Sequence, residues 1–160
     1  MKQQLCTATK EQELRALLKL WNASYPASLA HESVDDLISY LNGLTNCRHT
    51  FLWSKEEKGD LSAWFAVFER EGEPWFAMIV AEGHRKSGIG TKLIRTAQAE
   101  YNVLNGWVID HDEARMADGS GYPSPLAFYK RLGFQVLEAT RIETDRISAV
   151  KIQWNTASTA

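Results

Sequence analysis

A basic turn that contains glycines, residues 82–91, carries the groups in this chain that are best suited to holding phosphate. It follows the apolar run Trp75–Ala81 and precedes a helical pattern. Gly88 and Gly90 have no Cβ, so the backbone there can approach a ligand closely. A helix that starts at this turn directs free N–H groups and the positive end of its dipole toward the same place. Strand, turn and helix together predict a phosphate site.

Two common phosphate patterns do not fit this turn. A P-loop would need lysine where Ile89 stands, and the dinucleotide pattern would need a third glycine where Leu93 stands. The pattern Arg-x-x-Gly-x-Gly does fit, over Arg85–Gly90. Taken alone, it is also compatible with an ordinary helix start flanked by solvated basic residues.

A second segment, Ser124–Phe134, reads Ser-Pro-Leu-Ala-Phe-Tyr-Lys-Arg-Leu-Gly-Phe. Ser124 suits a helix N-cap, Pro125 the first helical position and Gly133 the residue after the helix. In this order, the two segments resemble the pyrophosphate loop and the A-x-x-F-Y-x-x-x-G-F signature of the GNAT superfamily of N-acetyltransferases. The sequence departs from that pattern at Tyr122, where many members have asparagine, and at Pro125, where they have alanine.

The resemblance implies that the chain binds acetyl-coenzyme A as a cosubstrate. The positions matching the family's pyrophosphate loop are Arg85, Lys86, Ser87, Gly88, Ile89, Gly90 and Thr91. Met78 and Val80 match positions whose main-chain groups bond the pantetheine amides, and we expect their side chains in the core. A main-chain N–H at the end of the same strand would stabilise negative charge on the thioester oxygen.

Tyr129 matches the family's general acid, which protonates the leaving coenzyme A sulfur. A phenol with a pKa of about 10 can supply a proton to a thiolate whose conjugate acid has a pKa of about 8.5. For the general base, His111 has the most suitable ordinary pKa, about 6.5. A water chain to a nearby carboxylate is an equal alternative. No metal is expected, because no second histidine stands at ligand spacing from His111.

The acceptor site is expected in two loops, residues 23–31 and 112–123. The second is long and is either a solvated excursion or a substrate lid. The residues predicted to contact the acceptor are Tyr25, Glu82, Asp112 and Glu113. The carboxylates of Glu82, Asp112 and Glu113 suit a positively charged amine.

The resemblance implies direct transfer of acetyl from acetyl-coenzyme A to a primary amine of a small molecule, peptide or protein. The alternative is a catalytically silent GNAT domain that binds an acyl-coenzyme A as a sensor or interaction module. Release of free thiol in the presence of amines distinguishes the two.

Composition predicts one domain over residues 1–160, with a flexible tail at 155–160. The chain is 44% hydrophobic and 24% charged, with a net charge of −2, so no basic field indicates nucleic acid as a partner. No apolar run approaches the length of about 20 residues that spans a membrane. The N-terminus lacks a signal-peptide core, and Cys6 and Cys47 fit no metal or redox spacing, so we expect a cytoplasmic protein. Association into a homodimer is left open.

Hydrophobic periodicity predicts the elements that position these residues. Strands are expected at 3–8, 48–54, 62–70, 74–81, 106–110, 134–140 and 147–154. Helices are expected at 10–21, with Thr9 as N-cap, and at 33–41, 89–101 and 125–132. The order βααβββαβαββ matches the GNAT fold, an α/β (α+β) architecture. That fold has a mixed, mostly antiparallel sheet with two splayed central strands, here 74–81 and 106–110.

Overall fold

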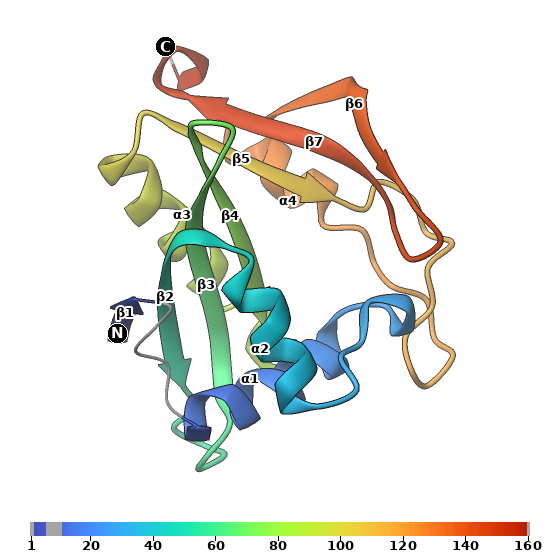
Figure 1. Cartoon of the computed structure of the whole chain (residues 1–160). Helices are drawn as coiled ribbons and strands as arrows, with labels where there is room; N and C mark the ends of the chain where they lie inside the picture. The colour runs from blue at the N-terminus through green and yellow to red at the C-terminus, as the bar shows by residue number, and fades with distance from the viewer. Residues whose placement is uncertain (1, 6–10, 160) are drawn as a thin grey trace.

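The computed structural model describes residues 2–5 and 11–159. Seven strands form one sheet in the order β1-β2-β3-β4-β5-β7-β6 (Figure 1). The strands are β1 (Lys2–Leu5), β2 (Thr45–Trp53), β3 (Leu61–Arg70), β4 (Glu73–Val80), β5 (Val103–Val108), β6 (Gln135–Glu143) and β7 (Ser148–Asn155). The helices are α1 (Glu11–Ser24), α2 (Val34–Asn42), α3 (Ile89–Glu100) and α4 (Leu126–Arg131).

The order of strands and α-helices confirms the predicted βααβββαβαββ. In the part of the chain that the structure describes, 3-10 turns are added at Ala27–Leu29, Glu82–His84 and Thr156–Thr159, the last of them within the segment expected to be a flexible tail. No helix among residues 2–5 and 11–159 is long and apolar enough to cross a membrane.

Several element boundaries differ from the prediction. Helix α1 runs on to Ser24, three residues past its predicted end at Trp21, because Pro26 is the next residue that breaks a helix. Strand β5 begins at Val103 and not at Gly106. The predicted strand 3–8 corresponds to β1, which is described over Lys2–Leu5. Residues 6–10, with the predicted N-cap Thr9, lie outside the described residues.

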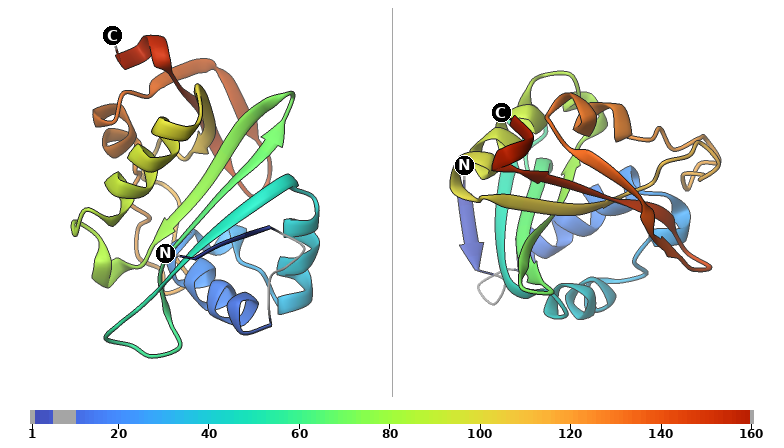
Figure 2. Two further views of the ribbon diagram at one scale, coloured as in Figure 1. Left: turned by 90° about the vertical axis from the view of Figure 1, so that its left-hand side faces the viewer. Right: turned by 90° about the horizontal axis from the view of Figure 1, so that it is seen from above.

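The sheet is covered on both faces, by α1 and α2 on one side and by α3 and α4 on the other (Figure 2). Strand β3 shows why the core has two halves, because successive side chains of a strand point to opposite faces. Trp64, Ala66 and Phe68 pack with α1 and α2, whereas Phe65 and Val67 pack with α3 and α4. A strand buried on both faces therefore reads as one continuous apolar run.

The central strands β4 and β5 are parallel but share a single residue pair, Trp75 with Asn105. Beyond that pair they run apart, as Figure 1 shows. The buried Asn105 amide donates to Glu73 Oε1 over 3.1 Å and to the Pro74 carbonyl over 3.2 Å. Its oxygen accepts from Gln153 on β7 over 2.9 Å. These three bonds join β4, β5 and β7 at the point where the V-shaped gap begins.

Candidate active site

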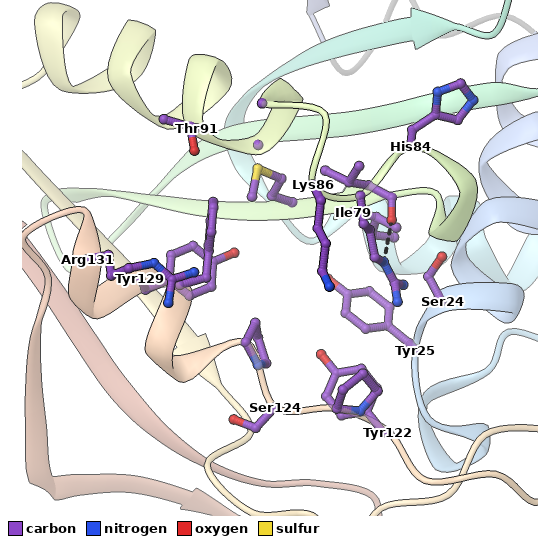
Figure 3. A pocket seen from close by; sticks show the side chains of 18 residues that line it. Ser24, Tyr25, Ile79, His84, Lys86, Thr91, Tyr122, Ser124, Tyr129 and Arg131 are labelled. Carbon is purple, nitrogen blue, oxygen red and sulfur yellow. Dashed lines mark hydrogen bonds between the residues drawn. The ribbon is translucent and has the colours of Figure 1, made fainter.

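A cavity of about 600 Å³ lies between the first turn of α3 and helix α4, along the outer half of β4 (Figure 3). We call it the central cavity. Four basic side chains line it and no carboxylate of a described residue does, so its potential favours an anion. These four are His84, Arg85, Lys86 and Arg131.

The turn before α3 has the geometry of an anion site. Gly88 is the N-cap residue with φ of 90°, and no side chain caps the helix. Lys92 is the first residue to bond back, to the Gly88 carbonyl over 3.0 Å, so the N–H groups before it point toward the turn. A Cβ on Gly90 would lie only 3.1 Å from Phe128 Cζ, so glycine is what allows α3 and α4 to approach this closely.

Most residues predicted to bind the coenzyme come together around this cavity, namely Met78, Val80, Arg85, Lys86, Gly88, Gly90 and Thr91. Ser87 and Ile89 do not line it. The Ser87 hydroxyl donates to the His84 carbonyl and so shapes the turn. Ile89 is half-buried and packs against the core. Arg85 Nε donates to the Val80 carbonyl over 3.1 Å, which occupies the last acceptor of β4.

Tyr129 is buried on α4 and lines the central cavity. Its ring packs against Phe76, Phe128 and Phe134 at centroid distances of 5.5, 5.1 and 5.6 Å. Burial raises the pKa of the Tyr129 hydroxyl well above its ordinary value, with a smaller effect from Tyr122. The hydroxyl therefore stays protonated throughout the range in which enzymes are assayed.

Ser124 holds the start of α4 in place. It stands one residue before Pro125, which we predicted as the first helical residue. Its hydroxyl donates to the Ile109 carbonyl over 2.6 Å and accepts from the Leu126 N–H over 3.3 Å. The helix itself starts at Leu126, after Pro125. Gly133 has φ of 92° and follows the last helical turn, as predicted. Ser124 thereby joins the end of β5 to the helix that carries Tyr129.

His111 does not lie in the central cavity or in the two cavities beside it. Its Nδ1 accepts from the Glu113 N–H over 3.1 Å. This bond holds the Nδ1 side of the ring against the main chain of its own loop. The sequence placed His111 correctly after β5, but nothing in its spacing indicated that the ring turns toward its own loop.

A second cavity, of about 690 Å³, adjoins the central one at Ser24, Arg85, Tyr122 and Pro123. We call it the acidic cavity, because Glu82, Asp112 and Asp118 line it. Glu113, which we also predicted near the acceptor, lines neither cavity.

The long loop 112–123 forms a hairpin whose residues are mostly exposed. Arg115 and Gly121 form an antiparallel bridge, and the Tyr122 N–H donates to the Ala114 carbonyl over 2.9 Å. The Arg115 carbonyl accepts from the Ala27 N–H over 2.8 Å, which holds the loop against the segment after α1.

Tyr25 and Tyr122 stand at the junction of the cavities, and Figure 3 shows both side chains at the same end of the central cavity. Tyr25 also lines a third cavity, on the α1 and α2 face, and Tyr122 lines all three. Burial raises the pKa of both phenols, and neighbouring tyrosines raise that of Tyr25 further.

No group of three His, Cys, Asp or Glu side chains within the described part of the chain is arranged to hold a metal ion. The side chain of Cys47 is buried. The chemistry available at the central cavity thus comes from main-chain N–H groups, basic side chains and phenols.

Residues 48–136 match the acetyltransferase (GNAT) domain family. The chain belongs to the GNAT acetyltransferases. This GNAT domain is accordingly an acyltransferase by family, and its matched region holds both the turn at Arg85–Gly90 and Tyr129. No curated protein matches it closely enough to narrow the activity further.

Solved structures agree with the GNAT fold. An aminoglycoside 6'-N-acetyltransferase complexed with coenzyme A has a TM-score of 0.66 at 12% identity, with 97% of each chain covered. A spermidine N-acetyltransferase variant from Vibrio cholerae has a TM-score of 0.60 at 17% identity, covering 97% of this chain and 95% of that one. A ribosomal-protein-alanine N-acetyltransferase from Brucella melitensis has a TM-score of 0.56 at 16% identity, covering 97% and 99%.

The sequence analysis did not identify some residues that line this GNAT site, and three of them bear on its chemistry. Arg131 lines the central cavity from the last turn of α4, and Ser24 lines it from the end of α1. Phe128 forms its wall beside Gly90. Arg131 stands two residues after Tyr129, inside the signature itself, so its basic character near a phosphate turn was the available signal.

Proposed function

We propose that this GNAT domain transfers an acetyl group from acetyl-coenzyme A directly to a primary amine. The observation that carries the proposal is the continuous cavity from the uncapped start of α3 to the Tyr129 hydroxyl. One end suits a pyrophosphate and the other supplies a buried phenol, and both lie along a strand edge that the splay of β5 leaves unpaired.

The pyrophosphate is placed at the turn Arg85–Thr91, where the helix start and the basic side chains favour negative charge. The pantetheine arm then lies along β4, with its amides at the main chain of Met78 and Val80. This placement requires Arg85 to release the Val80 carbonyl, to which its Nε donates. Arg85 exchanges that neutral acceptor for the charged phosphate, which is the stronger partner.

In the transfer, the neutral amine attacks the thioester carbon and the C–S bond of the tetrahedral intermediate breaks. A main-chain N–H at the end of β4 stabilises the oxyanion. Tyr129 donates its hydrogen to the sulfur as charge develops there, and it recovers a proton from water. The amine nitrogen loses its extra proton to solvent. We do not assign this last step to His111, because its ring does not line the central cavity and its Nδ1 accepts from the Glu113 N–H.

The test is release of coenzyme A thiol from acetyl-coenzyme A in the presence of a broad panel of amines, followed by mass spectrometry of the acceptor. The expected result is release that depends on the amine, with a gain of one acetyl group on it. Calorimetric binding of acetyl-coenzyme A without amine-dependent release for any acceptor would instead favour the silent, coenzyme-binding alternative.

A further inference from the structure

The third cavity has a volume of about 220 Å³ and lies on the α1 and α2 face of the sheet. We call it the aromatic cavity. Its walls come from α1, α2 and the diverging strands β4 and β5, and its lining is mainly ring side chains. Among these are Trp21, Tyr25, Tyr40, Phe76, Trp107 and Tyr129.

The aromatic cavity meets the central cavity inside the strand gap. Both are lined by Met78 of β4 and by Tyr25, Tyr122 and Tyr129. A coenzyme that fills the central cavity therefore presents its acyl group near the residues common to both. A molecule in the aromatic cavity approaches the acyl group from the opposite face of the sheet.

One charged side chain lines this cavity, the guanidinium of Arg70 at the end of β3. Its central carbon lies 5.1 Å from the Phe68 ring centroid and 4.9 Å from that of Trp75. No carboxylate of a described residue forms an ion pair with it, and none lines the cavity. A guanidinium held on aromatic faces without a carboxylate partner has its donors available for an anion.

The position of Arg70 sets the distance between its guanidinium and the point where the two cavities meet. The guanidinium lies over Trp75, whereas the two cavities meet at Met78, three residues further along β4. A strand rises about 3.3 Å per residue, so these points are about 10 Å apart. An acceptor whose anionic group reaches Arg70 thus needs its amine at the other end of a spacer of that length.

We propose that the aromatic cavity is the acceptor site and that it takes a compact primary amine with an apolar, ring-sized body and a carboxylate at its far end. This inference rests on the proposed acetyl transfer. A polycation is a poor fit, because the cavity offers a positive charge and no carboxylate. The cationic acceptor predicted from the sequence would instead need the acidic cavity, with Glu82 and Asp112.

The same surroundings account for how the amine loses its proton. Burial among apolar groups disfavours an ammonium ion and lowers its pKa, and the neighbouring Arg70 charge acts in the same direction. The acceptor thus enters this cavity as the neutral amine, and no side chain is needed as a strong base.

The experiment compares three amines as acceptors and as ligands. 4-(2-Aminoethyl)benzoate carries its amine and carboxylate at opposite ends of a ring, 2-phenylethylamine lacks the carboxylate, and spermidine is a polycation. Thiol release gives KM for each, and quenching of tryptophan fluorescence reports binding without turnover, because Trp21 and Trp107 line the cavity. We expect the benzoate to have the lowest KM.

Arg70→Gln supplies the decisive variant, since Arg70 is half-buried and its loss leaves no carboxylate unpaired. It should raise KM for the benzoate by about 10- to 100-fold, the usual effect of losing a charged hydrogen bond. It should leave KM for 2-phenylethylamine unchanged. Arg95→Gln, on the exposed face of α3, is the matched control and should change neither.

The outcomes separate this inference from the proposed function. Turnover of spermidine that depends on Glu82 and Asp112 but not on Arg70 would overturn the aromatic cavity as acceptor site and leave acetyl transfer intact. Benzoate binding that Arg70→Gln abolishes, with no thiol release for any amine, would support the site and overturn the transfer. Equal benzoate affinity in wild type and Arg70→Gln would show that Arg70 does not bind the carboxylate, which overturns the proposed acceptor class.

Discussion

At the scale of single residues, Tyr129 is the clearest case of a side chain whose ring and hydroxyl have separable roles. The ring is enclosed by Phe76, Phe128 and Phe134, whereas no hydrogen bond from the hydroxyl to another described residue is found. Removing the oxygen thus leaves the packing in place.

Tyr129→Phe should lower kcat by about 10²-fold, the usual range for a lost general acid. The affinity for acetyl-coenzyme A, measured by calorimetry, should remain that of the wild type. Tyr101→Phe, at the end of α3 and away from the three cavities, is the control and should change neither quantity. Wild-type kcat in Tyr129→Phe, with chemistry shown to limit the rate, would make Tyr129 a packing residue only.

Gly88→Asp and Gly90→Asp should each abolish calorimetric binding of acetyl-coenzyme A. Each places a carboxylate where the pyrophosphate is expected, and Gly90→Asp also forces atoms against Phe128. Gly88 has a positive φ, so its replacement also strains the backbone. Gly59→Asp controls for that strain, since Gly59 has φ of 89° in the distant turn between β2 and β3. Retained binding in both loop variants would rule out this phosphate site.

The sequence predicted those parts of the site that depend on local chain geometry. The turn at Gly88 and the helix of Tyr129 are read from neighbouring residues, so their patterns sufficed. Arg70 could not be found in this way, because its importance comes from packing on Trp75, a residue of another strand. The orientation of the His111 ring could not be predicted either, because the direction of a loop side chain is set by contacts that periodicity does not report.

At the scale of elements, the junction of β4 with β5 depends on one amide. Asn105 is fully buried and bonds to Glu73, Pro74 and Gln153. A polar residue before a glycine reads as loop in a sequence, which is why β5 was predicted to start three residues late. Burial of the amide makes sense only once the strands on both sides are known.

Asn105→Ala should lower the free energy of unfolding by about 2–3 kcal/mol, because it leaves the Pro74 carbonyl and the Glu73 carboxylate without a buried donor. Urea denaturation measures this loss. Gln153→Ala removes only one of the three bonds and should cost less than half as much. Equal losses in the two variants would mean that the amide bonds to β4 contribute nothing to the junction.

At the scale of the whole molecule, one fully buried titratable group lies away from the active site. His49 is fully buried, and its Nδ1 accepts from Trp64 Nε1 over 3.0 Å. Burial lowers the pKa of His49 from 6.5 to about 4, although the buried carboxyl of Glu13 acts in the opposite direction. Cys47 Sγ lies 3.6 Å from its other ring nitrogen.

Acid should therefore destabilise the fold below pH 6.5. In that range the unfolded chain protonates His49 and the folded chain does not, so stability is lost as pH falls toward 4 and is unaffected above pH 7. Between pH 7 and pH 5 the loss should be about 2 kcal/mol in urea denaturation. His49→Gln should be less stable at pH 7 but should lose less stability over this interval. Identical pH slopes in wild type and His49→Gln would contradict a buried neutral imidazole.

The position of β7 between β5 and β6 has a consequence for the order in which parts of the chain can fold during synthesis. Strands β2, β3 and β4 meet as successive hairpins, so that half of the sheet can form early from neighbouring segments. Strand β5 pairs with β7 along its whole length, with Val103 opposite Asn155 and Val108 opposite Val150. Among the described strands, β6 pairs only with β7. While the chain emerges from the ribosome, β5 and β6 therefore have unpaired backbone groups until β7 is made. We therefore expect the strand gap and the cavities around it to be completed last, and nascent chains to be most prone to aggregate just before β7 is made.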